Sequence, residues 1–192
     1  VPTKLSVPQQ QEDRPEKPIT KSDDPPGVRL ADDSAAFPLN PKNGATQVVR
    51  NSYGSPEAMN TLGNFYKEGL GTAIDFKAAY NWYRKAADQG LASALYSLGV
   101  CYWQGTGVPQ DADEAMACFR QSAERGYGPA EYQVALQYFR GIDGNPDYVE
   151  GNRWLERAAR RGVADAQYML AGHYMMGRGV PENLVLSYVW VI

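Results

Sequence analysis

The sequence predicts an all-α protein: an α/α solenoid, or superhelix, of antiparallel helix pairs, preceded by a disordered tail. Two observations predict the solenoid. Every 36 residues the chain repeats a glycine, at Gly54, Gly90, Gly126 and Gly162. After each glycine, an alanine, a leucine or valine, and a tyrosine follow four residues apart, which is the spacing of one helical face. A repeat of this length is typical of stacked helical units.

Residues 1–44 are predicted to be a disordered, proline-rich and charged tail or linker. They hold eight of the thirteen prolines and a single aromatic residue, Phe37, with six basic and seven acidic side chains. Such a segment buries too little apolar surface to offset the entropy of ordering it. A short capping helix is expected over residues 45–53.

Four repeat units follow, the last of them incomplete, at residues 54–89, 90–125, 126–161 and 162–192. Each is predicted to hold two helices joined by a loop of about five residues. Ser55 and Pro56 suit a helix N-cap and first position, and Gly69 suits the left-handed residue after a helix. Asp75 and its equivalents, Asp111, Asp147 and Asn183, stand just before the second helices; Glu114 and Glu150 then have capping-box spacing.

Packing between the two helices of a unit is expected to rely on small residues in the first helix. They occur in register at Gly63, Gly99, Ala135 and Ala171. The second helix carries an aromatic pair such as Trp82 and Tyr83, which we expect to fill the space that the small residues leave.

Many of these residues fit the approximate pattern AxYxLGxxYxxGxGVxxDxxKAxxWYxKAAxxG. The matches are Ala94, Tyr96, Leu98, Gly99, Tyr102, Gly105, Gly107, Val108 and Asp111, with Asp75, Trp82, Tyr83, Lys85, Ala86 and Ala87 in the preceding unit. In this pattern the chain resembles the Sel1-like repeat family, relatives of the tetratricopeptide solenoids, over about residues 54–192. The third unit departs from it, with Gly141 to Gly144 in place of the GxGV turn and Leu155 in place of the aromatic, so its loop is expected to follow a different path.

The resemblance implies that the first helices line a concave groove that binds a partner. The predicted groove residues are Val100, Trp103, Gln104, Leu136, Phe139, Arg140, Met175 and Met176. Trp, Phe, Met and Arg are residue types that interfaces favour. The alternative is that superhelical curvature buries Trp103 and Phe139 against the neighbouring unit.

No catalytic, cofactor-binding or metal-binding residue is predicted, and the chain is not expected to be an enzyme. His173 is the only histidine and lacks a nucleophile or carboxylate at motif spacing, so we expect a structural role. Glycine pairs such as Gly105 and Gly107 follow helices and are interpreted as turns rather than phosphate-binding loops. Most carboxylates are expected at helix caps or on solvated faces. Cys101 and Cys118 are compatible with two small buried hydrophobes or with one disulfide.

The predicted function is a non-enzymatic scaffold or adaptor that binds a peptide or protein segment in the groove. The alternatives are a cell-envelope module that associates with glycan or peptidoglycan, and an inhibitor or immunity protein. A net charge of −3 without clustered Lys or Arg argues against nucleic-acid binding.

The apolar run from Leu184 to Ile192 is shorter than the ~20 residues of a membrane span, so no membrane insertion is predicted. As an uncapped second helix, it is expected to self-associate, to dock on another chain, or to be followed by more sequence. The first residue is Val rather than Met, which indicates processing or excision. With the proline-rich tail and the family resemblance, this favours the bacterial cell envelope or periplasm; the cytoplasm is the alternative.

Overall fold

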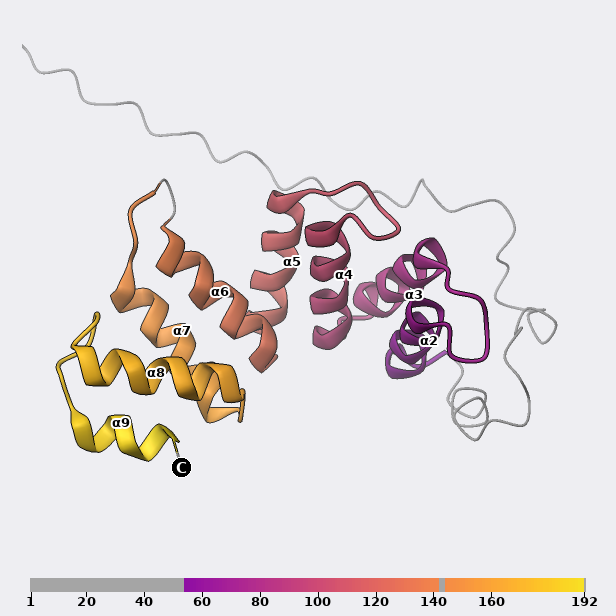
Figure 1. Ribbon diagram of the computed structural model, residues 1–192. Helices are drawn as coiled ribbons and strands as arrows, with labels where there is room; N and C mark the ends of the chain where they lie inside the picture. The colour runs from indigo at the N-terminus through magenta and orange to yellow at the C-terminus, as the bar shows by residue number, and fades with distance from the viewer. Residues whose placement is uncertain (1–53, 142–143, 192) are drawn as a thin grey trace, which may run out of the picture. The chain divides into compact units, whose positions relative to one another are not determined.

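The part of the chain that the computed structural model describes, residues 54–141 and 144–191, is built of α-helices (Figure 1). They are α2 (Pro56–Glu68), α3 (Phe76–Asp88), α4 (Ala92–Gln104), α5 (Ala112–Glu124), α6 (Gly128–Arg140), α7 (Tyr148–Arg160), α8 (Ala164–Met176) and α9 (Leu184–Val191). The predicted tail, residues 1–44, and the predicted capping helix, residues 45–53, lie outside the described residues.

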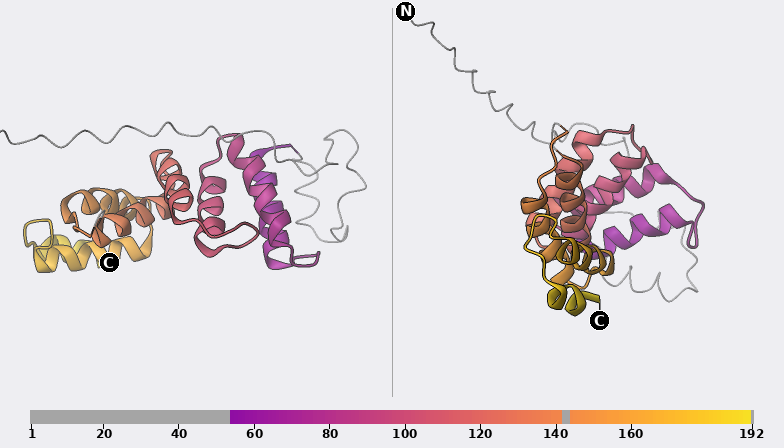
Figure 2. Two further views of the ribbon diagram at one scale, coloured as in Figure 1. Left: turned by 90° about the horizontal axis from the view of Figure 1, so that it is seen from above. Right: turned by 60° about the vertical axis from the view of Figure 1, so that its left-hand side comes forward.

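Successive helices form hairpins that stack along the chain as a solenoid. The first helices of the four hairpins begin 36 residues apart, at Pro56, Ala92, Gly128 and Ala164. Each helix packs on the next one in sequence, from α2 on α3 to α8 on α9, and Figure 2 shows this order from two further directions. The predicted all-α solenoid and its period are confirmed.

The second helix of each repeat begins at a side-chain cap, as predicted. The Asp75 carboxylate accepts the amide of Ala78 at 2.9 Å, and the equivalent side chains of the later repeats cap their helices in the same way. A second bond, which the sequence did not predict, closes the loop. The Asp75 amide donates to the carbonyl of Tyr66 at 2.9 Å, and the same bond recurs at Asp111, Asp147 and Asn183. Each inter-helix loop is therefore held by its last residue at both the backbone and the side chain.

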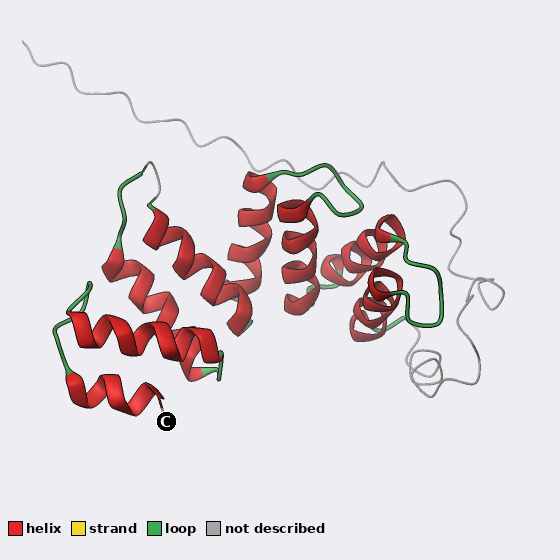
Figure 3. Cartoon of the chain, viewed as in Figure 1, coloured by secondary structure: helices red, strands yellow, loops and turns green. Residues whose placement is uncertain are grey.

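The predicted loop length of about five residues is wrong, because seven residues separate the two helices of a repeat (Figure 3). Gly69 ends α2 in the left-handed conformation, at φ 70°, and the chain then needs a second glycine with positive φ, Gly71, before it reaches the capping aspartate. The third repeat differs, as predicted: Gly141 has ψ 129°, whereas Gly69 has ψ 28°. Figure 3 shows no strand among the residues that it describes.

Close approach of the two helices depends on matched side-chain sizes. A Cβ added at Gly99 would lie 2.6 Å from the ring of Phe119, and one added at Gly63 would overlap the ring of Tyr83. The third repeat has Ala135 and Leu155 at these places, and both are fully buried in one core cluster. Relative to the first two repeats, alanine replaces glycine and adds a methyl group, while leucine replaces the larger aromatic ring. The two changes in side-chain volume therefore offset each other. Thus the small residues act as predicted, while the neighbouring Trp82 stays only partly buried.

Candidate functional site

An apolar cavity of about 580 Å³ lies between α6, α8 and α9. Its lining residues are Leu136, Phe139, Arg140, Tyr168, Met169, Ala171, Gly172, His173, Met175, Met176, Arg178, Ser187 and Val191. Five of the eight predicted groove residues are among them. We call this space the apolar cavity.

The helix register explains why these side chains converge. The first helices α6 and α8 stand in adjacent repeats, and each presents its last turn to the same side of the array, so Phe139 and Met175 occupy equivalent positions. Met175 and Met176 are 53% and 55% exposed, and Tyr168 is 77% exposed. The cavity thus has large apolar side chains that water still reaches.

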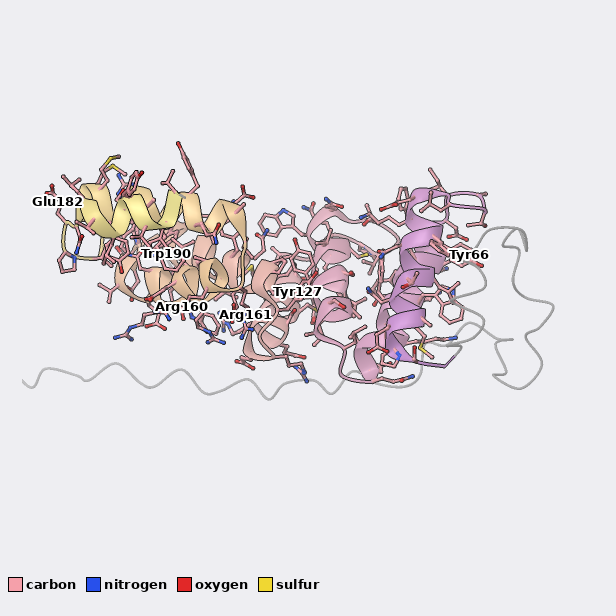
Figure 4. All side chains as sticks on the ribbon, turned by 90° about the horizontal axis from the view of Figure 1, so that it is seen from below. Tyr66, Tyr127, Arg160, Arg161, Glu182 and Trp190 are labelled. Atoms are coloured by element: carbon pink, nitrogen blue, oxygen red, sulfur yellow. The ribbon has the colours of Figure 1, made fainter. Side chains whose placement is uncertain are left out.

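The third wall of the cavity is α9, which is attached to the array through Trp190. This ring packs against the core cluster that includes Leu155 and Leu170, and Figure 4 shows it among the side chains of the last helices. Ser187 and Val191 of α9 face the cavity. Most of the other apolar residues of this helix are exposed, namely Leu184, Val185, Leu186, Tyr188 and Val189.

Phe139 lines the cavity but also joins the third and fourth repeats. Its ring stacks on Tyr148 with centroids 5.7 Å apart and meets His173 edge-on at 4.9 Å. Gly151 makes room for it, since a Cβ there would overlap the Phe139 ring. The packing alternative holds for this residue, which also lines the cavity, so truncating it would disturb the fold as well as the surface.

Trp103, Val100 and Gln104 lie outside the apolar cavity. Trp103 is 42% exposed, so curvature does not bury it, and the guanidinium of Arg140 lies over its ring at 5.7 Å from the centroid. Val100 and Gln104 line a smaller hollow of about 70 Å³ beside Lys67. Arg140 therefore connects the exposed tryptophan of the second repeat to the cavity.

His173 is held in one tautomer inside the wall of the cavity. The amide nitrogen of Asn152 donates to the carbonyl of Arg178 at 2.7 Å, so its oxygen faces His173 Nδ1 at 2.6 Å and accepts the proton there. Burial, and then the positive charge of Arg178, lower the pKa of His173. A neutral, buried ring that bridges two repeats fits the predicted structural role.

The two cysteines are free and buried in one core cluster, so the disulfide alternative is not realised. Burial raises the pKa of Cys118 to about 12 and raises that of Cys101 as well. Both groups therefore stay protonated at neutral pH, and neither is an activated nucleophile.

The paired glycines after the first helices are turn residues. Gly105 ends α4 with φ 70°, and Gly107, with φ 78°, lies directly against the Phe76 carbonyl at the start of α3. That close contact with backbone occupies the space a phosphate would need. In residues 54–141 and 144–191, no three metal-ligating side chains gather into a group that could hold an ion. None of the helices described is both long and apolar enough to cross a membrane.

Comparison with known proteins identifies the repeat. A family model described as Sel1 repeat matches residues 56–91, 92–127, 128–163 and 164–191. The chain belongs to the Sel1 repeat family. Two solved structures are similar to it: a Sel1 repeat protein from Oxalobacter formigenes, 34% identical with a TM-score of 0.67, and a protective antigen of uropathogenic Escherichia coli, 31% identical with a TM-score of 0.65. Each similarity covers 73% of this chain, which spans 57% and 30% of the length of those two proteins. A comparison with curated protein sequences gave no significant match.

One carboxylate of the third Sel1 repeat is an exception to the expectation that most carboxylates lie at caps or on solvated faces. Glu131 is fully buried. Its two oxygens accept from Arg157 Nε at 3.0 Å and from Arg161 Nε at 2.9 Å, and Arg157 also donates to the carbonyl of Ala123 at 3.3 Å. Two arginines that are 45% and 49% exposed thus reach inward to compensate one buried charge. Figure 4 shows Arg161 beside Arg160 at the end of α7.

The only sequence signal for this ion triad is a break in register. The position of Glu131 holds Met59 and Leu95 in the first two repeats and Gln167 in the fourth, so an acidic residue stands where the two preceding repeats are apolar. The partners follow 26 and 30 residues later in the chain. No local motif connects them.

Proposed function

We propose that this chain is a non-enzymatic interaction module of the Sel1 repeat family that holds a segment of a partner protein in the apolar cavity. The observation that carries the proposal is the exposure of Met175, Met176 and Tyr168 around a space of about 580 Å³. Exposed apolar residues that surround a concavity are a typical interaction surface.

The chemistry of the lining supports a flexible apolar ligand. Methionine side chains are unbranched and polarisable, so Met169, Met175 and Met176 can adapt to bound side chains of different shape. The potential reactive groups nearby serve the fold: His173 is hydrogen-bonded to Asn152, and the cysteine thiols are buried in another cluster. These features favour binding over catalysis.

Selection from a displayed library of random peptides tests the proposal. Wild type and the variant M175E/M176E are immobilised, and the peptides retained by each are sequenced. We expect wild type to enrich peptides with large apolar residues and the variant to lose that enrichment, because charge in the wall disfavours apolar contact. The matched control is I74E/V149E, which adds the same charge at two exposed apolar positions outside the lining. Equal enrichment on M175E/M176E and wild type would refute the assignment of the cavity. Phe139→Ala is unsuitable here, since it would also remove the contact with Tyr148.

A glycan ligand is the second candidate, and the exposed rings of Trp103 and Tyr168 favour it because aromatic faces also pack on sugars. A glycan ligand is consistent with a location in the bacterial cell envelope, which we also propose. Co-sedimentation with purified peptidoglycan, compared between wild type and W103A/Y168A, tests this candidate. Wild-type protein that stays in the supernatant counts against it.

Self-association through α9 is a separate proposal about partners. Its support is the exposure of Leu184, Val185 and Tyr188 on one short helix. Light scattering over a range of concentrations should show a mass above that of a monomer, and V185E/Y188E should restore the monomer mass. A monomeric wild type at high concentration would oppose the proposal.

A further inference from the structure

We propose that the bound segment carries aspartate or glutamate next to its apolar anchor, and that Arg140 and Arg178 bind these carboxylates. This inference rests on the proposed function and names the chemistry of its partner: an acidic, apolar peptide segment.

The described residues that line the cavity include two arginines and no aspartate or glutamate. Arg140 is the last residue of α6, and Arg178 follows α8, so the two charges come from the ends of neighbouring first helices. Both side chains are exposed. Positive charge around an apolar space favours a ligand with negative charge beside apolar groups, and it disfavours a basic one.

Both guanidinium groups lie over aromatic rings. The Cζ of Arg140 lies 5.7 Å from the ring centroid of Trp103, and that of Arg178 lies 5.5 Å from the ring centroid of Tyr148. A guanidinium that lies over a ring engages it through its face, which leaves N–H groups along its edge for hydrogen bonds. That edge matches the two oxygens of a carboxylate.

The aromatic partners also restrict where each arginine can point. Tyr148 stacks on Phe139, which itself lines the cavity, so the ring that Arg178 lies over is part of the packing behind the apolar wall. Restricting a long side chain before binding lowers the entropy that the complex loses. The apolar anchor and the carboxylate contacts are therefore adjacent and partly preorganised.

The same library selection tests this inference with a second pair of variants. Wild type is compared with R140Q/R178Q, and the matched control R125Q/R153Q removes two positive charges from exposed arginines outside the cavity lining. We expect wild type and the control to enrich aspartate and glutamate over lysine and arginine in the retained peptides. R140Q/R178Q should keep the apolar enrichment and lose the acidic one.

One retained peptide is then used to measure how much the acidic residues contribute to affinity. Its affinity is measured by fluorescence anisotropy together with that of a version in which glutamine replaces the acidic residues. Wild type should bind the acidic peptide about tenfold more tightly at low salt, because two exposed charge-assisted contacts are lost in the glutamine version. R140Q/R178Q should bind both peptides equally.

The outcomes separate the two proposals. Equal acidic content in the peptides selected by wild type and R140Q/R178Q would overturn the role of the arginines and leave the apolar cavity as a binding site. If wild type and M175E/M176E retain the same peptides, the proposed function fails and this inference fails with it. Circular dichroism of each variant confirms that the helices are intact.

Discussion

Removing the two arginines around Glu131 is expected to destabilise the protein more than removing the carboxylate itself. In R157Q/R161Q, a fully buried carboxylate loses charged donors that lie at 3.0 Å and 2.9 Å. An uncompensated buried charge costs about 3 to 5 kcal/mol. In Glu131→Leu the buried charge is gone, and the two arginines, which are 45% and 49% exposed, can turn to water. Because leucine is native at the equivalent position Leu95, we expect a loss of about 1 kcal/mol or less.

Urea unfolding followed by far-UV circular dichroism measures this difference. The comparison uses transition midpoints at an unchanged slope, since a changed slope would indicate that the repeats no longer unfold together. Arg157 also lies over the ring of Trp154, at 4.2 Å, so the single variant Arg161→Gln is measured to separate that contact from the ion triad. Arg160→Gln, which removes an exposed pair with Glu156, is the control and should barely move the midpoint. Finding Glu131→Leu as destabilising as R157Q/R161Q would refute the reasoning, because the carboxylate would then contribute net stability.

Three further predictions follow from the packing and the titrating groups. Gly99→Ala should lower the free energy of unfolding by about 1 to 3 kcal/mol, because its Cβ would lie 2.6 Å from the Phe119 ring. Adding Phe119→Leu copies the alanine–leucine pair of the third repeat and should recover part of this loss. Additive losses of the two substitutions, measured by urea unfolding, would contradict the prediction. Because the pKa of His173 is lowered in the folded protein, its contribution to stability is complete above about pH 6.5 and is lost as pH falls through the folded-state pKa. His173→Gln should therefore make the melting temperature depend less on pH between neutral and acid pH. An unchanged pH dependence of the melting temperature would count against this. Cys101 and Cys118 should react with a thiol-specific reagent only in denaturant, and rapid labelling of the native protein would be inconsistent with their burial.

The fold could be predicted because the same helix caps and packing residues recur in every repeat. Asp75 and Ser55 carry cap chemistry that any single helix would show, and the 36-residue period fixes how the units stack. The loop length was missed because Gly69 alone is enough to end a helix, whereas the second positive-φ residue, Gly71, depends on the path to the next cap. Local chemistry determines where helices begin and end, but the length of a connection depends on the three-dimensional turn.

The candidate site was only partly accessible from sequence. Register places Met175 and Met176 on the surface of a first helix, and the structure adds a wall from α9, whose Val191 faces the same space. Glu131 could not be predicted as buried, because its compensation comes from side chains 26 and 30 residues away. The pairing of Arg140 with Trp103 is likewise a contact between repeats. Interactions between units depend on the stacking geometry, which a pattern within one unit does not contain.

The backbone bond that closes each inter-helix loop places one protected amide at the same point of every repeat, at Asp75, Asp111, Asp147 and Asn183. Amide hydrogen exchange at these positions measures the free energy of local opening in each repeat. Four amides at the same structural position, three of aspartate and one of asparagine, therefore report on four neighbouring units within a single molecule. The difference in protection between the first and the fourth shows how local stability varies along the array.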